Sequence, residues 1–132
     1  MKYMLDTNIC IYLIKEKPKN VLDKFNSLQI GDLCISIITF AELEYGVEKS
    51  NYPDQNRAAL RAFLSPINIL NFQQKEAIKY AQIRAELEKR GKIIGAYDLM
   101  IAAHALARNL ILVTNNVGEF QRIPDLTIEN WV

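Results

Sequence analysis

The sequence predicts an α/β protein in three layers, with a central, mostly parallel β-sheet covered by helices on both faces. Apolar runs of strand length alternate along the chain with segments of helical periodicity. The strand runs are continuously apolar, which is typical of strands buried on both faces of a parallel sheet. A chain of 132 residues can bury a sizeable core, so we expect one domain spanning residues 1–132.

The first half of the chain is expected to open with a strand and two helices. Pro18 suits the first turn of a helix, because its missing N–H has no partner there. The β-branched segment LCISI favours a strand. The expected elements are a strand at 2–5, helices at 8–16 and 18–28, a turn at 31–32, a strand at 33–37 and a helix at 38–50.

The second half continues the alternation, after a polar stretch at 51–56 that we expect to be a loop. Pro66 and Gly91 each indicate the end of a helix. The expected elements are a helix at 58–64, a strand at 67–70, helices at 73–90 and 97–109, a strand at 110–114 and a last strand within 126–130. No internal repeat or linker interrupts this order.

The composition excludes several classes of protein. No apolar run approaches the roughly 18 residues of a membrane span, and Asp6 and Asn8 interrupt the segment where a signal peptide is apolar. We therefore expect a cytoplasmic protein with no membrane partner. Cys10 and Cys34 lie in apolar segments, as reduced core cysteines do, and with a single His they give no zinc-site spacing.

The net charge of +1 does not indicate a nucleic-acid-binding protein, although positive charge is concentrated locally. Each concentration is either a solvated helix face or a binding patch, and the sequence leaves both interpretations open. The two groups are Lys15, Lys17, Lys19 and Lys24, and Arg84, Lys89, Arg90 and Lys92.

Acidic residues recur where expected strands end or the next helices begin. In a parallel sheet these positions meet at one crevice, so the side chains can converge there. Each residue also has a structural interpretation: Asp6 and Asp98 as helix N-caps, Glu42 as a surface residue, Glu119 as a loop acid and Asn116 as a turn residue.

If the acids converge, their mutual repulsion raises their pKa values unless a cation neutralises them. Carboxylate oxygens select Mg²⁺ or Mn²⁺, which can activate water for phosphodiester hydrolysis. A haloacid-dehalogenase-like phosphatase would need an Asp where Asn8 stands, and a receiver domain would need an Asp after INIL. His104 lies about 240° around the helix from Asp98, which favours a packing or surface role over a catalytic base.

Four segments in order, LDTN (5–8), SIITFAELEYG (36–46), GAYDLMIAAHA (95–105) and VTNNVGEF (113–120), resemble the motifs of the PIN-domain ribonucleases. Within that family the chain looks like the VapC-type toxins of bacterial type II toxin–antitoxin modules. The three central acids of the family match Asp6, Glu42 and Asp98. Its last acidic position falls either at Asn116, where many members have Asp, or at Glu119.

The resemblance implies a PIN-like fold and a Mg²⁺-dependent endoribonuclease, with Mn²⁺ as a substitute, that cuts structured RNA such as tRNA or rRNA and inhibits growth. Asp6 and Asp98 would be the metal ligands, with Glu42 and Glu119 completing the catalytic acids. The residues implied to orient these acids are Thr7, Asn8, Thr39, Thr114 and Asn116.

The same resemblance implies a homodimer and a VapB-type antitoxin whose C-terminal segment lies across the site. The larger toxin–antitoxin complex would bind DNA through the antitoxin. The alternative is a PIN-like module that binds RNA or a partner without cleaving it. An intact set of acids argues against that alternative.

Overall fold

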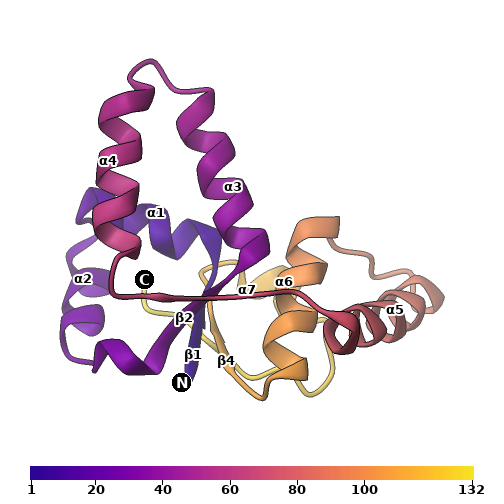
Figure 1. Cartoon of the computed structure of the whole chain (residues 1–132). Coiled ribbons are helices and arrows are strands. Elements are labelled where there is room, and N and C mark those ends of the chain that lie inside the picture. The colour runs from indigo at the N-terminus through magenta and orange to yellow at the C-terminus, as the bar shows by residue number, and fades with distance from the viewer.

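A five-stranded, all-parallel sheet in the order β3-β2-β1-β4-β5 forms the centre of the molecule. The structure, a computed structural model, describes all 132 residues (Figure 1). The strands are β1 (Tyr3–Leu5), β2 (Leu33–Ser36), β3 (Asn68–Leu70), β4 (Ile111–Val113) and β5 (Ile128–Glu129). The helices are α1 (Thr7–Lys15), α2 (Lys19–Asn26), α3 (Ile37–Glu48), α4 (Pro53–Leu64), α5 (Gln74–Lys89), α6 (Ala96–Ala107) and α7 (Val117–Phe120), with a short 3₁₀ helix at Ile30–Asp32.

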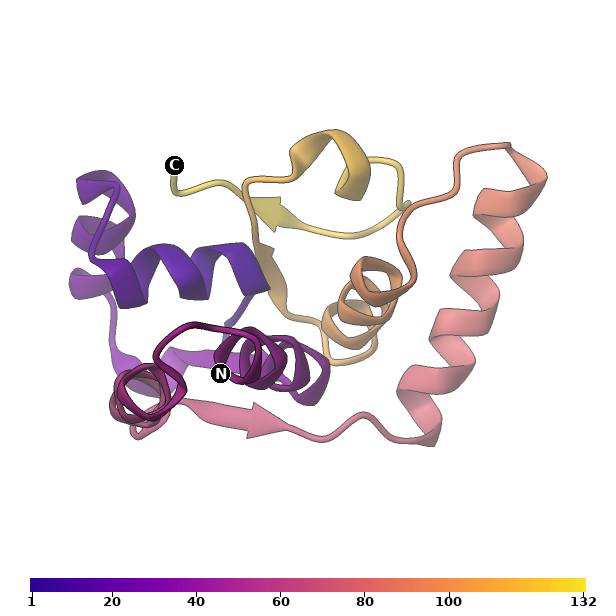
Figure 2. The same cartoon turned by 90° about the horizontal axis from the view of Figure 1, so that it is seen from above.

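Two apolar clusters cover the two faces of the sheet, so the three-layer prediction is confirmed. Successive residues of β1 point to opposite faces: Leu5 packs with α1, α3 and α4, whereas Met4 packs with α5 and α6. Figure 2 shows α1 and α2 on one side of the central strands, and α5 and α6 on the other. Burial on both faces explains the continuously apolar strand sequences.

The α3–α4 hairpin projects well beyond the sheet (Figure 1). The expectation of a loop at 51–56 was wrong from Pro53 onward, because α4 begins there, with Pro at the first helical position. Its polar first turns lie at the free end of the hairpin, where there is no core to pack against. Ion pairs between the helices take the place of apolar contacts, Arg57 with Glu48 and Arg61 with Glu44.

The other boundaries differ from the predictions by a few residues at most, apart from two features near the C-terminus. The last strand covers only Ile128–Glu129, and the short helix α7 was not predicted. Cys10 and Cys34 are buried and free, as expected, and burial raises the pKa of both thiols. No helix is long and apolar enough to cross a membrane.

Candidate active site

Asp6 stands at the carboxyl end of the central strand β1 and is only 3% exposed. It is also the N-cap of α1, since its Oδ1 accepts a hydrogen bond of 2.8 Å from the Thr7 backbone N–H. Its Oδ2 accepts a second bond, also 2.8 Å, from the hydroxyl of Thr114 at the end of β4. The capping role and the position at the strand end therefore coexist in one residue.

Glu42 reaches the same place from α3. The Thr7 hydroxyl donates to its Oε1 over 2.6 Å, and the hydroxyl oxygen of Thr39 lies 3.3 Å from that of Thr7. The interpretation of Glu42 as a free surface residue was wrong, because its side chain is half-buried and bonded to α1. Thr7 thus donates hydrogen bonds to both acids, from its backbone N–H to Asp6 and from its hydroxyl to Glu42.

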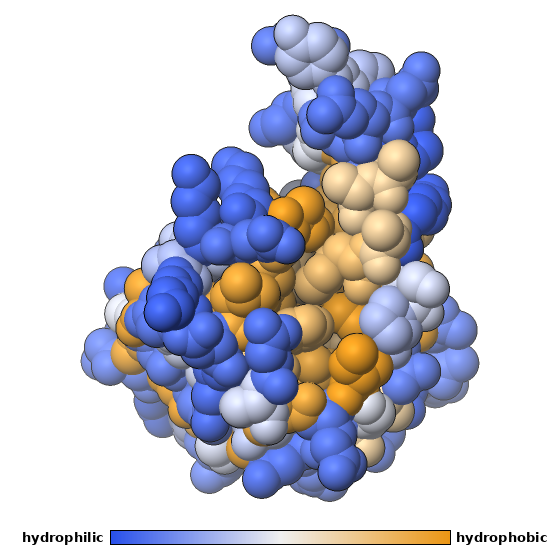
Figure 3. All heavy atoms as spheres, turned by 90° about the vertical axis from the view of Figure 1, so that its left-hand side faces the viewer, coloured by the Kyte–Doolittle hydropathy of each residue, from blue (hydrophilic) through white to orange (hydrophobic).

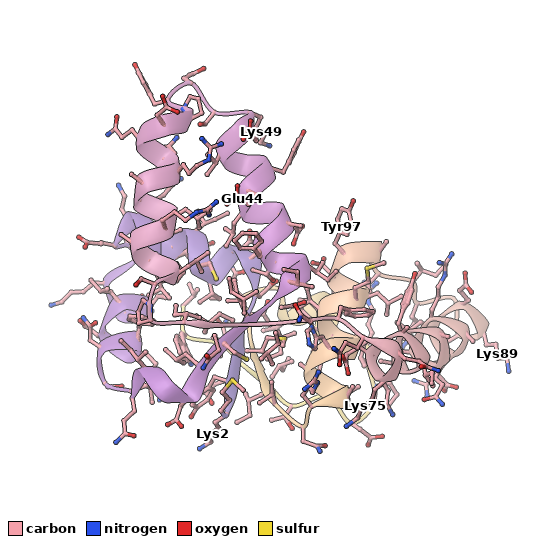
Figure 4. All side chains as sticks on the ribbon, viewed as in Figure 1. Lys2, Glu44, Lys49, Lys75, Lys89 and Tyr97 are labelled. Atoms are coloured by element: carbon pink, nitrogen blue, oxygen red, sulfur yellow. The ribbon has the colours of Figure 1, made fainter.

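Asp98 lies in the first turn of α6, but it is not the cap of that helix. The N-cap is Gly95, and no side chain caps the helix, so the N-cap interpretation of Asp98 was wrong. A Cβ placed on Gly95 would lie 3.7 Å from Oδ2 of Asp98, so the carboxyl turns back over the start of the helix. Tyr97 beside it points into solvent (Figure 4).

Glu119 on α7 is the fourth acid. The Asn116 side chain donates a 3.0 Å bond from Nδ2 to Oε2 of Glu119, and the Asn116 backbone N–H donates to the Thr114 hydroxyl over 3.0 Å. Asn116 therefore holds Glu119 toward the site, and Thr114 links this loop to Asp6. Of the two candidates for the last acidic position, Glu119 supplies a carboxylate beside Asp98.

Electrostatics show that the four acids share one site. Burial raises the pKa of Asp98 to about 7, with further contributions from a hydrogen bond with Glu119 and from the negative charges of Asp6, Glu119 and Glu42. Burial also raises the pKa of Asp6, against the lowering effect of its hydrogen bonds with Thr114 and Thr7. None of the four acids forms an ion pair with Lys or Arg. The pKa values of Asp6 and Asp98 are thus raised mainly by burial, and the repulsion expected between converging acids adds to the rise.

Asn8 and His104 both lie outside the acidic site, and only Asn8 was expected in it. The Asn8 side chain is exposed and makes no hydrogen bond with the acids. His104 is fully buried in α6, with Nδ1 2.8 Å from the hydroxyl oxygen of Ser36 and its ring against Phe72, which is the packing role expected of it.

Asn115 was missed by sequence reasoning. It donates a 2.8 Å bond to the Tyr12 hydroxyl and so fastens the loop after β4 to α1. The paired asparagines of TNN were the available signal, but only the second of them was considered.

The donor set fits a hard divalent cation, because the converging groups are carboxylates without any counter-charge. No three His, Cys, Asp or Glu side chains are close enough to enclose one ion by themselves. A cation held between Asp6 and Asp98 would therefore keep several water ligands, as Mg²⁺ usually does in proteins.

The proteins to which this chain is similar are named ribonucleases, which agrees with the acidic site described above. Residues 3–126 match the PIN domain family. Ribonuclease VapC2 of Haemophilus influenzae is 53% identical over 132 residues, covering 100% of this chain and 99% of the relative. The chain belongs to the VapC family of PIN-domain ribonucleases.

Two further relatives of this VapC family are informative. The tRNA(fMet)-specific endonuclease VapC of Salmonella typhimurium is 49% identical, covering 99% of this chain and 98% of the relative. The crystal structure of VapBC2 from Rickettsia felis, bound to a DNA fragment from its promoter, superposes with a TM-score of 0.93 at 47% identity, covering 100% of both chains.

Proposed function

We propose that the protein is a divalent-metal-dependent endoribonuclease that acts as the toxin of a type II toxin–antitoxin pair. The single observation that carries the metal dependence is the set of four acids, Asp6, Glu42, Asp98 and Glu119, which share a site and have no cationic partner. Such a set is electrostatically unfavourable by itself and becomes favourable when a cation binds. A non-catalytic binding module has no need of it.

In this proposal Asp6 and Asp98 hold Mg²⁺ or Mn²⁺, and the bound ion supplies activation of water and stabilisation of charge on the phosphoryl oxygens. The protein fixes the acids in advance. Thr7 and Thr114 orient Asp6, Thr7 and Thr39 place Glu42, and Asn116 directs Glu119. Hydrogen bonds of this kind set the direction of the carboxylates.

The substrate we propose is structured RNA, with tRNA ahead of rRNA because a relative 49% identical is named a tRNA(fMet)-specific endonuclease. Loss of such RNA would stop translation, and with it growth, in the bacterial cytoplasm. Homodimerisation is part of the same proposal.

The partner we propose is a VapB-type antitoxin, in a complex that binds DNA through the antitoxin, as in the VapBC2 structure. An apolar hollow of about 290 Å³ between α1, α3 and α4 offers a place for it, lined by Ile11, Ile14, Leu43, Val47 and Leu60. Figure 3 shows apolar surface gathered at the base of the projecting hairpin. Glu42 lines this hollow as well as the acidic site, so a bound segment would reach the acids.

Cleavage of total RNA by the purified protein tests the proposal. We expect cleavage with Mg²⁺, none in EDTA, and recovery when Mg²⁺ is restored in excess. Asp98→Asn serves as the matched negative control, since it keeps the shape of the side chain and removes the charge. Cleavage that continues unchanged in EDTA would overturn the metal mechanism.

A further inference from the structure

A second hollow, polar and of about 550 Å³, lies between α7 and the loop that follows α5. No apolar residue lines it; the lining is Gly91, Lys92, Gly118, Gln121 and Arg122. The hollow and the acidic site share α7 as a wall, since this helix carries Glu119 and Gly118. The opposite wall continues from Lys92 to Gly95, where the helix that bears Asp98 begins.

The hollow carries positive charge that no acid neutralises. Within the basic group predicted around residue 90, Arg84 pairs with Glu88 and Arg90 with Glu86. Lys92, in contrast, is exposed and in no ion pair. Lys89 of the same group is also exposed and in no ion pair, so Lys92 is distinguished by its place in the lining of the hollow.

Arg122 is a second uncompensated cation, and it is fixed in place. Its Nη1 donates a 3.1 Å hydrogen bond to the Ile93 backbone oxygen, while its other N–H groups remain available. An arginine held in this way presents a rigid fork that suits the oxygens of a phosphate. Sequence patterns gave no sign of this pair, because Lys92 and Arg122 are 30 residues apart.

The backbone around the hollow is open. A Cβ built on Gly91 or on Gly118 would meet no atom within 4 Å. A phosphate oxygen can therefore approach the main chain at these two positions without displacing a side chain.

We propose that this hollow binds a backbone phosphate of the RNA strand beside the bond that is cut; this inference rests on the function proposed above. The four acids repel the phosphates of RNA, so a bound strand needs positive charge close by. Lys92 and Arg122 supply that charge in the hollow walled by α7, the helix that also carries Glu119. Phosphate contacts of this kind fix the register of a nucleic acid without reading its sequence.

The test compares Lys92→Gln/Arg122→Gln with the wild-type protein, using labelled initiator tRNA in EDTA so that no cleavage occurs. We expect about tenfold weaker binding at low salt, and a plot of log Kd against log salt that is shallower by about 1–2, because two phosphate contacts are lost. With Mg²⁺, KM should rise by a similar factor while kcat is unchanged.

Lys19→Gln/Lys75→Gln is the matched control, because it removes two exposed, unpaired lysines that lie away from the hollow. Figure 4 shows Lys75 at the end of α5 opposite to Lys89 and the loop that follows it. This control should bind as the wild type does. Equal losses in both double variants would overturn the inference, since they would reflect net charge alone.

Lys92→Gln alone provides a second measurement if the change at Arg122 disturbs the loop, because the Lys92 side chain makes no hydrogen bond and its backbone bond to Leu87 is kept. It should lower the salt slope by about half as much as the double variant. Wild-type cleavage of tRNA with an unchanged slope in these variants would overturn the phosphate site and leave the proposed function standing. A wild-type protein that neither binds nor cleaves RNA would overturn both.

Discussion

Asp6 and Asp98 lie near enough for the charge of one to raise the pKa of the other, yet the protein stabilises their charges differently. Asp6 accepts hydrogen bonds on both oxygens, from the Thr7 backbone and the Thr114 hydroxyl, and these bonds lower its pKa against the effect of burial. Asp98 has no such donors, and burial, with further contributions from Glu119, Asp6 and Glu42, raises its pKa to about 7. One half of the site, at Asp6, thus has hydrogen-bond donors that offset part of the rise in pKa, whereas the other half, at Asp98, has no such support.

The largest effect on RNA cleavage is expected at Asp98, in the half of the site without supporting hydrogen bonds. Asp98→Asn should bring RNA cleavage below detection and remove growth inhibition in cells, because the amide cannot provide the charge that holds the metal. The helix should be unaffected, since its N-cap is Gly95. Gel assays of tRNA cleavage and circular dichroism measure the two properties, and an active Asp98→Asn protein would refute the assignment of Asp98.

The next effect separates Glu119 from Asn116. Glu119→Gln should shift the Mg²⁺ dependence of the cleavage rate toward higher concentration, since it removes a full charge from the site. Asn116→Ala removes only the amide that directs Glu119, so it should cost about 10–100-fold in rate. Cleavage rates of both variants, measured over a range of Mg²⁺ concentrations, distinguish a metal ligand from an orienting residue. A wild-type response in Glu119→Gln beside an inactive Asn116→Ala would mean that Glu119 is a bystander.

A smaller effect on the cleavage rate is expected at Asp6, in the half of the site that hydrogen bonds support. Thr114→Val removes the hydroxyl that donates to Asp6, so the rate should fall by about tenfold. The acidic limb of the pH–rate profile should also move to higher pH, because this bond lowers the pKa of Asp6. Thr114→Ser keeps the hydroxyl and should restore both properties. Equal profiles for Val and Ser would show that the bond does not tune Asp6.

The smallest effect is on stability without metal. The Asp98 pKa is about 7 in the fold and near its ordinary 3.8 in the unfolded chain. Between these values the native state binds more protons, so the free energy of unfolding falls as pH rises from about 4 to 7. Above pH 7, Asp98→Asn should be more stable than wild type by about 2 kcal/mol after allowance for partial exposure, or about 7 °C in Tm.

Thermal melts in EDTA at low and high pH measure that difference in stability. At pH 3 or below the two proteins should melt alike, because the wild-type carboxyl is then mostly protonated in both the folded and the unfolded state. At high pH, Asp6→Asn should raise the thermal stability less than Asp98→Asn does, since hydrogen bonds already support the Asp6 charge. A gain that is the same at every pH would contradict the account of the unsupported half.

The sequence was informative about features that follow from local pattern and topology. Continuous apolar runs predicted the parallel sheet, and such a sheet brings strand ends together, so the convergence of Asp6 with Asp98 could be foreseen. Interactions set by packing between distant segments could not. Glu76 is fully buried because Arg108, 32 residues away, pairs with it, and nothing in the local pattern indicates that contact.

Two errors concern where helices begin. Residues 51–56 show no apolar periodicity, although Pro53, the first residue of α4, is of a type favoured at that position. The capping interpretation of Asp98 was reasonable from residue type alone, but α6 starts two residues earlier, at Ala96, with Gly95 as its N-cap. Apolar periodicity does not fix element boundaries of this kind to the residue.

The most direct test of the central claim is the pH dependence of Mg²⁺ binding, measured calorimetrically in buffers of different ionisation enthalpy. Because Asp98 is protonated below a pKa of about 7, the ion must displace a proton there. We expect release of about one proton per ion at pH 6 and an affinity that rises about tenfold per pH unit up to 7, then levels off. Binding that is independent of pH and releases no proton would contradict a cation site built on the unsupported Asp98.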